Sequence, residues 1–336
     1  MFATGRTRED EIVPEGPAVR RGLLTTSAGT HLGPFTALDW AMFVSIGAIW
    51  GSSFLLIAIG LDDFEPGVIT WLRILFGASV LWLVPAARAP IPPGDGLRLV
   101  ALSLLWVAVP FTLFPIAEQS ISSGLTGLLN GAMPIFAVTI GSLMLRRLPG
   151  RTQLVGLSVG FAGVAGIALP RVAEGSSEAL GVALALLATV CYGVAINLAA
   201  PLTQRSGSLP VMARMLALAS VWTAPLGVLG LGGSDFAWGP LAAVAGLGIM
   251  GTGVAFVLMG RLVSRVGSSR ASFATYLIPV VALVLGVVFR DEAVHLTSVV
   301  GVALVIAGAA LASRRERPAG EAVVVAEEPA TDPRAP

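Results

Sequence analysis

Cysteine, histidine and charged residues are all scarce in this chain of 336 residues. The one cysteine, Cys191, excludes an internal disulfide and a cysteine metal cluster. The two histidines, His31 and His295, lie outside the long apolar stretches, so we expect no intramembrane histidine to relay protons or bind a metal. Lysine is absent, because all 21 basic residues are arginine. We therefore predict neither a metal nor a cofactor.

Charged residues make up only 12% of the chain, against roughly 25% in soluble globular proteins. Hydrophobic residues make up 55%, and the mean hydropathy is +0.85. The uncharged stretches approach the ~20 residues that a helix needs to cross a bilayer core. The sequence therefore predicts an all-α membrane protein with ten transmembrane helices between disordered cytoplasmic tails at 1–37 and 314–336. The expected spans are 40–60, 66–86, 98–117, 121–145, 153–169, 179–200, 208–231, 239–260, 268–289 and 296–313.

The arginines indicate the orientation, because cytoplasmic loops collect them. When the N-terminus is placed inside, 17 arginines fall in the tails and inner loops, and only Arg171 and Arg290 fall in outer loops. Arg73 and Arg214 are left within spans. We therefore expect a multi-pass protein of the inner (plasma) membrane with both termini cytoplasmic. The net charge of +1 gives no sign of a nucleic-acid partner, and none is expected.

The stretch 134–165 recurs 145 positions later at 279–310, with nine identical pairs among 32. About three identities are expected by chance in a chain so rich in Ala, Gly, Val and Leu. A second match, at an offset of 141, pairs Arg73 with Arg214. Because each half holds five spans, the second half enters the membrane from the opposite face. The expected domains are two inverted five-helix repeats, at 38–170 and 178–313.

Both halves also carry short motifs of aromatic, proline and small residues. They are Trp50-Gly51-Ser52-Ser53-Phe54, Pro66 with Arg73, the run from Ile121 to Pro134, and Pro279 with Glu292, Gly301 and Gly308. With these motifs, residues 38–313 resemble the EamA-type transporters of the drug/metabolite transporter superfamily. The resemblance implies export or exchange of small metabolites or drugs through a cavity between spans 1–4 and 6–9, with spans 5 and 10 peripheral. In one departure, Arg147 stands where the family usually has a glutamate after span 4.

Arg73 and Arg214 are the sharpest functional candidates, because a buried arginine is costly in lipid and should face a cavity or a partner. At 1.5 Å per residue, Arg73 lies about 10 Å below the outer helix end at Pro66. Arg214 lies four residues past Pro210, near the inner end. The functional interpretation is contact with an anion or carboxylate at each mouth of one pathway. The structural interpretation is that each guanidinium caps carbonyls of a neighbouring span or reaches the headgroups.

Other candidates for the cavity wall are polar or aromatic residues within the spans. Polar side chains are disfavoured against acyl chains, so some should line the cavity, although each could instead form an interhelical hydrogen bond. Trp50 and Tyr192 occupy matching places in the two halves and could stack on a substrate or simply pack. The set comprises Trp50, Ser52, Ser53, Asn130, Tyr192, Asn197, Thr252, Thr275 and Tyr276.

Pro134 and Pro279 are predicted to lie inside their spans, where a proline frees a carbonyl one turn back. They are candidate hinges, and static kinks are the alternative. Glu118 ends span 3 next to Gln119 and Ser120, and the expected state is an exposed loop carboxylate. A coupling proton on Glu118 would require the carboxyl group to be desolvated.

Small residues spaced four apart form a face on span 5, at Gly156 and Gly160, and on span 10, at Ala303 and Ala307. Such faces allow close helix packing, either within the fold or between two protomers. A homodimer is therefore left open as a partner, beside a small-molecule substrate and membrane lipid.

The favoured function is transport of a small metabolite or drug by alternating access, with no enzymatic step. One rival is an intramembrane enzyme acting on lipid, which would need clustered acids or histidines at one membrane face. The pair Asp62-Asp63 lacks a second acidic cluster. The run from Gly246 to Gly251 matches a dinucleotide fingerprint but follows no strand, so we reject it. The other rival is a non-transporting membrane scaffold.

Overall fold

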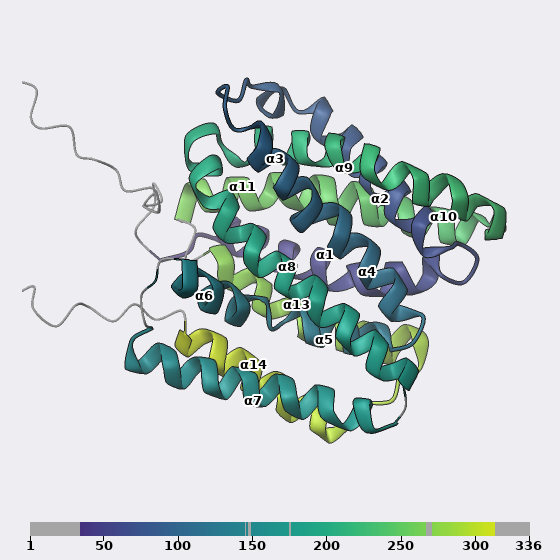
Figure 1. Cartoon of the computed structure of the whole chain (residues 1–336), viewed down its shortest axis with the longest axis vertical. Coiled ribbons are helices and arrows are strands. Elements are labelled where there is room, and N and C mark those ends of the chain that lie inside the picture. Colours follow the sequence, from purple (N-terminus) through teal and green to yellow (C-terminus); the bar gives the residue numbers. More distant parts are fainter. Residues whose placement is uncertain (1–33, 145, 147–148, 175, 267–270, 313–336) are drawn as a thin grey trace, which may run out of the picture.

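The computed structural model describes residues 34–144, 146, 149–174, 176–266 and 271–312, and within these ranges all regular secondary structure is helical. Most of both predicted tails and the position of Arg147 lie outside the described residues. Nine helical stretches of the described chain are long and apolar enough to cross a membrane. A tenth apolar helix, Leu296–Ala312, is shorter, with 17 residues. The predicted all-α fold of ten spans is confirmed (Figure 1).

Six of the spans are single helices, and the other four are built from two or three consecutive segments. The single helices are α1 (Ala37–Gly60), α2 (Pro66–Leu83), α7 (Arg151–Glu174), α8 (Ser176–Ser206), α9 (Ser208–Gly230) and α14 (Leu296–Ala312). Span 3 is α3 (Gly96–Leu102), η2 (Ser103–Ala108) and α4 (Val109–Glu118), and span 4 is α5 (Ser123–Asn130) and α6 (Met133–Met144). Span 8 is α10 (Trp238–Gly246), η4 (Leu247–Val254) and α11 (Ala255–Val266), and span 9 is η5 (Ser272–Tyr276) and α13 (Leu277–Arg290). A short 3-10 turn, η1 (Pro85–Arg88), follows α2.

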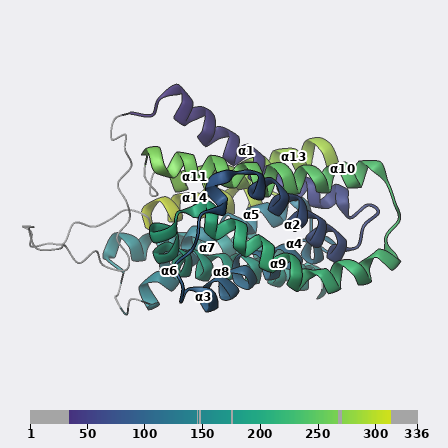
Figure 2. The same cartoon turned by 90° about the horizontal axis from the view of Figure 1, so that it is seen from above.

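The two halves of the chain interleave instead of forming separate bodies. Helix α1 packs on α13, α2 on α9, and α4 and α6 on α8. Figure 2 shows α10, α11 and α13 along one side of the molecule and α6, α8 and α9 along the other. Helices α7 and α14 pack on each other at one edge (Figure 1). The centre of the molecule is therefore built jointly by spans 1–4 and 6–9.

Corresponding spans of the two halves deviate from the α-helix in the same places. Spans 3 and 8 each contain a π-helical segment, η2 and η4. Spans 4 and 9 are each interrupted just before the paired prolines. Arg146 and Asp291, which are 145 positions apart, are the two described non-glycine residues with positive φ, at 50° and 51°. The duplication is thus present in the backbone as well as in the sequence.

The prolines occupy a different local position from the one predicted. Pro134 is the second residue of α6, and Pro279 is the third residue of α13, so neither lies inside a continuous helix. The first turn of a helix tolerates proline because its N–H groups have no intrahelical partner. A Cβ atom on Gly131, in the break of span 4, would meet the ring of Pro279 at 3.0 Å. The interrupted spans of the two repeats therefore touch.

Glycines account for the close packing of α7 on α14. A Cβ atom on Gly308 would overlap the backbone of Gly156 and Gly160, and one on Gly163 would meet the carbonyl oxygen of Gly301 at 2.6 Å. The small-residue face of span 5 is thus used within the fold. The face predicted at Ala303 and Ala307 on span 10 is not used for packing within the fold, and its use between protomers stays a prediction. Both residues are exposed, and Gly301 and Gly308 make the contact.

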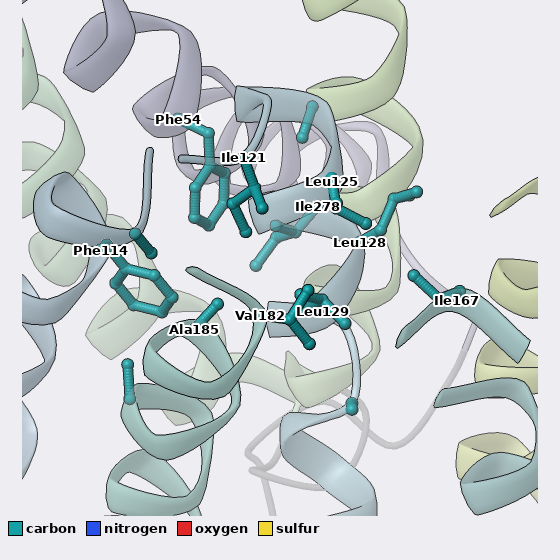
Figure 3. Packing of buried hydrophobic residues seen from close by; sticks show 14 of the residues in the cluster. Phe54, Phe114, Ile121, Leu125, Leu128, Leu129, Ile167, Val182, Ala185 and Ile278 are labelled. Atoms are coloured by element: carbon teal, nitrogen blue, oxygen red, sulfur yellow. The ribbon is translucent and has the colours of Figure 1, made fainter. Parts of the chain in front are cut away.

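The bundle has a near end, where α1 begins and α14 ends, and a far end on the opposite side. Near the far end an apolar cluster fills the space between spans 1, 3, 4, 6 and 9 (Figure 3). Within it the rings of Phe54 and Phe114 meet edge to face, with centroids 5.6 Å apart. At the far surface Arg290 binds Asp62 through two hydrogen bonds of 2.9 Å. The far end is closed in this conformation.

Candidate functional site

Arg73 lies midway along α2 and is only 7% exposed. Its Nε donates a hydrogen bond of 3.2 Å to Oγ1 of Thr252, in the π-helical segment η4. The guanidinium carbon lies 3.7 Å from the ring centroid of Phe111 on α4, which is cation–π geometry. Neither contact neutralises its charge. Arg73 thus presents a cation inside the bundle, between spans 2, 3 and 8.

Small residues allow these spans to approach closely enough for the contact. A Cβ atom on Gly77, one turn beyond Arg73, would overlap the side chain of Thr252. A Cβ atom on Gly248 would lie 2.6 Å from the carbonyl oxygen of Arg73. The π-helical segment redirects the side chains of span 8, and such segments are frequent at functional sites. Local glycine content and helix geometry together place Thr252 against Arg73.

Aromatic side chains surround this position. Trp50 on α1 donates from Nε1 to the carbonyl oxygen of Gly251 at 3.1 Å and meets Phe256 edge to face at 5.9 Å. Phe114 packs against Tyr192 with ring centroids 5.8 Å apart. The structure therefore gathers five of the predicted candidates at mid-depth. They are Trp50, Ser53, Arg73, Tyr192 and Thr252, and Ser53 joins them through its approach to Gly251.

Glu118, expected as an exposed loop carboxylate, is placed differently. It is the last residue of α4, and both carboxyl oxygens are buried with no hydrogen-bond partner. The charges of Arg73, Arg290 and Glu292 act on it. The helix continues further than the neighbouring polar residues suggested. The spacing of Phe111, Phe114 and Glu118 along one helix face is the signal that could have revealed this placement.

Glu292, in the loop after α13, reaches the other repeat. Its carboxylate accepts from the backbone N–H of Ser123 at 2.9 Å, from the Ser123 hydroxyl at 2.6 Å and from the N–H of Gly124 at 2.8 Å. These are donors of the first turn of α5, where a negative charge is also favoured by the helix dipole. Gly286 leaves room for the carboxylate, since a Cβ atom there would overlap it. Glu292 therefore joins the repeats at the far end.

Arg214 does not share the surroundings of Arg73. Its Nη1 donates to the carbonyl oxygens of Pro210 at 3.2 Å and Ala87 at 3.4 Å. It lies beside a pocket of about 360 Å³ at the near end. Small and apolar residues make up most of the pocket lining, and its polar members are Ser206, Ser208, Arg261 and Ser264. The contacts of Arg214 match the carbonyl-capping interpretation, and the two arginines are not equivalent.

The other predicted candidates are scattered. Asn197 donates from Nδ2 to the carbonyl oxygens of Ala137 at 2.9 Å and Gly193 at 2.8 Å, which ties α8 to α6. Asn130 ends α5 with its Oδ1 buried and unpartnered. The remaining three candidates, Ser52, Thr275 and Tyr276, are half-buried. The hydroxyl groups of Ser52 and Thr275 donate to backbone carbonyls of their own helical segments. Among the described residues no group of three His, Cys, Asp or Glu side chains could hold a metal ion.

In a comparison with known proteins, the same family model matches both halves of the chain. The family model described as "EamA-like transporter family" matches residues 39–169 and 179–314. A "Probable terminal-alkyne amino-acid exporter" of Streptantibioticus cattleyicolor is 30% identical and aligns over 82% of this chain and 93% of its own length. An "Uncharacterized transporter" of Archaeoglobus fulgidus is 24% identical over 82% of this chain and 99% of its own length.

Two further relatives extend the comparison. The "Uncharacterized inner membrane transporter YedA" of Escherichia coli K12 is 26% identical over 71% of this chain and 78% of its own length. A solved crystal structure is similar in fold, with a TM-score of 0.56 and 20% identity over 83% of this chain and 99% of the other. At that identity the structural likeness bears on the fold alone.

Proposed function

Because the chain belongs to the EamA-like transporter family, we propose that this multi-pass membrane protein exports or exchanges an amino acid or a similar small carboxylate-bearing metabolite by alternating access. The observation that carries the proposal is Arg73, a buried cation at mid-depth with aromatic neighbours and no ion-pair partner within the described chain. An arginine in that setting suits a carboxylate. The similarity to the "Probable terminal-alkyne amino-acid exporter" supports the same substrate class.

The substrate would bind between Arg73 and the aromatic rings of Trp50 and Tyr192. Apolar walls with one fixed charge are typical of small-molecule sites. No covalent step is proposed. The protein would lie in the plasma membrane, with the near end and both termini cytoplasmic, because the arginines concentrate at that end.

Alternating access would use the interrupted spans. The far end is packed by Phe54 and Phe114, so in the proposed cycle this conformation would take up substrate from the near side. Pro134 and Pro279 begin helices that follow irregular segments, where rotation disturbs few backbone hydrogen bonds, so they remain our candidate hinges.

Transport by purified full-length protein in liposomes tests the proposal. The vesicles are loaded with the twenty proteinogenic L-amino acids and L-propargylglycine, and efflux is followed by mass spectrometry. We expect wild-type protein to release at least one of them faster than empty vesicles. Arg73→Lys should reduce that rate about tenfold, since it loses the planar, multiply donating guanidinium.

Two matched variants complete this test. Arg98→Lys changes an arginine at the near surface and should transport normally. Arg214→Lys should lower stability more than transport, because its contacts are to backbone carbonyls. Absence of efflux for every compound would count against amino-acid transport. Full transport by Arg73→Lys would show that the guanidinium group of Arg73 does not bind the substrate.

A further inference from the structure

Glu118 holds a carboxyl group in an unusual setting. Both oxygens are buried and lack hydrogen-bond donors in the described structure, although the residue stands only a few residues from the far surface. An ionised carboxylate without donors is costly to bury, so this conformation accommodates the neutral acid. The contrast with Glu292 is direct, because three donors of α5 hold that carboxylate. Two carboxyl groups at the same end of the bundle therefore have opposite surroundings.

The charged and titratable groups around Glu118 come from several elements. Helix α2 contributes Arg73, and the end of α13 with its loop contributes Arg290 and Glu292. Helix α8 contributes Tyr192, which packs against Phe114 of the same helix as Glu118 and interacts with Arg73, with Cys191 beside it. Glu178 lies one turn before Gly181 on α8, and a Cβ atom on Gly181 would meet Ile121 at 3.0 Å. Helix α5 and segment η2 carry no titratable side chains, and the acid of α1 is at its near end.

Arg290 and Glu292 are already held by strong partners, whereas Arg73 contacts a hydroxyl group and an aromatic ring and no carboxylate among the described residues. Arg290 is bound to Asp62, and Glu292 is bound to α5. No ion pair joins Arg73 to Glu118 in the described chain, although their charges lie within electrostatic range. A cation and an acid on neighbouring spans thus face the interior with neither neutralised by the other.

We propose that Arg73 and Glu118 form a zwitterion site in which the ammonium group of an amino acid and a proton compete for the carboxyl group of Glu118. This inference rests on the proposed transport function and deepens it. The substrate carboxylate pairs with Arg73, and the substrate ammonium pairs with ionised Glu118. When the substrate leaves, a proton binds to an oxygen of Glu118 and restores the neutral acid, which suits the buried, donor-free position of this carboxyl group.

Competition for one carboxyl group makes the carrier an antiporter. Glu118 releases its proton when the amino acid binds from the near side, and it takes up a proton from the far side after the amino acid departs. One proton moves inward for each zwitterion that moves outward. The inward proton gradient of a plasma membrane would then drive export.

Proton flux measured beside amino-acid flux tests this mechanism. Full-length protein is reconstituted into liposomes that hold the same amino-acid panel and the pH dye pyranine. We expect efflux from wild-type vesicles to rise about tenfold under an inward proton gradient and to acidify the lumen. Glu118→Gln should abolish the acidification and flatten the pH dependence of efflux, whereas Glu118→Asp should retain both. Glu65→Gln, an exposed far-end change outside the site, should behave as wild type.

The outcomes separate this inference from the transport function. If wild-type protein moves amino acids without protons, or if Glu118→Gln stays coupled, the zwitterion site is wrong and the carrier function stands. If wild-type protein moves no amino acid, the transport proposal itself fails. Should Glu118→Gln not fold, wild-type protein in unbuffered detergent decides, because adding a transported amino acid must release a proton upon binding. Binding without release would overturn the mechanism.

Discussion

Arg73 and Arg214 show how similar residues in the two repeats acquire different roles from their neighbours. Arg73 meets a hydroxyl group and an aromatic ring, whereas Arg214 meets two backbone carbonyls. The sequence predicted that both are inside spans, and it left their roles open. Their environments depend on which spans face them, and that information is distributed over the whole fold.

Thr252→Val should weaken transport by removing the hydroxyl group that orients Arg73. A buried donor that loses its acceptor costs about 1–3 kcal/mol, so we expect KM for the transported amino acid to rise about tenfold or more. Thr252→Ser should retain the wild-type KM. The control is Thr223→Val, because the buried hydroxyl of Thr223 bonds only Ala219 of its own helix. Equal KM values for both valine variants would show that Thr252 does not position Arg73.

Glu118 marks where residue-level reasoning failed. Its neighbours Gln119 and Ser120 are polar, and composition alone placed all three in a loop. The helix instead continues to Glu118 and carries its side chain onto the face shared with Phe114. Helical phase, taken over the last two turns of α4, would have been the better guide.

At the scale of elements, Glu292 serves as a helix cap supplied by the opposite repeat. Glu292→Gln removes the negative charge that interacts favourably with the positive end of the α5 dipole, and it weakens three hydrogen bonds. We therefore expect the free energy of unfolding to fall by about 1–2 kcal/mol. Thermal unfolding in detergent measures this as a lower Tm. Asp235→Asn, an exposed change at the same end, should leave Tm unchanged. An unaltered Tm for Glu292→Gln would mean that the cap contributes nothing.

The pair α7–α14 gives a second prediction at this scale. Gly308→Ala should destabilise the protein by about 1–3 kcal/mol, because the new methyl group overlaps the α7 backbone and forces the helices apart. Gly166→Ala is the matched control, since a Cβ atom there meets nothing within 4 Å and alanine favours helix. The Tm of Gly308→Ala should fall, and that of Gly166→Ala should hold or rise. A reversed order would contradict the packing described.

The positions of the transmembrane helices were predictable because they follow from the long apolar runs in the sequence. The long apolar runs predicted all ten spans, and the match at an offset of 145 aligned Arg146 with Asp291, although it did not predict their positive φ. The interruptions of spans 3, 4, 8 and 9 were not predictable in detail. Segment η4, for example, consists of apolar and small residues with no local signal for π geometry, and it packs on α1 and α2. The contact of Gly131 with Pro279 joins distant parts of the chain that the sequence alone did not pair.

For the whole molecule, ten crossings place both ends of the described chain at the near end, as Figure 1 shows. Among the described residues, three ion pairs link different spans at the two surfaces. Asp39 with Arg265 and Asp95 with Arg205 lie at the near end, and Asp62 with Arg290 lies at the far end. A carrier that opens alternately to the two sides of the membrane must break contacts at one surface and form contacts at the other. The far-end pair, together with the Glu292 cap, is therefore expected to open when substrate leaves.

The orientation of the molecule is open to a direct test with introduced thiols. Gly232, in the α9–α10 connection at the far end, and Pro93, between η1 and α3 at the near end, are both exposed. In a Cys191→Ala background, a membrane-impermeant maleimide applied to intact cells should label Gly232→Cys and not Pro93→Cys. Permeabilised cells should show labelling of both. Because retention of arginines on the cytoplasmic side is the physical basis of this orientation, the opposite labelling pattern would mean that the molecule is inverted in the membrane and that the proposed direction of transport is reversed.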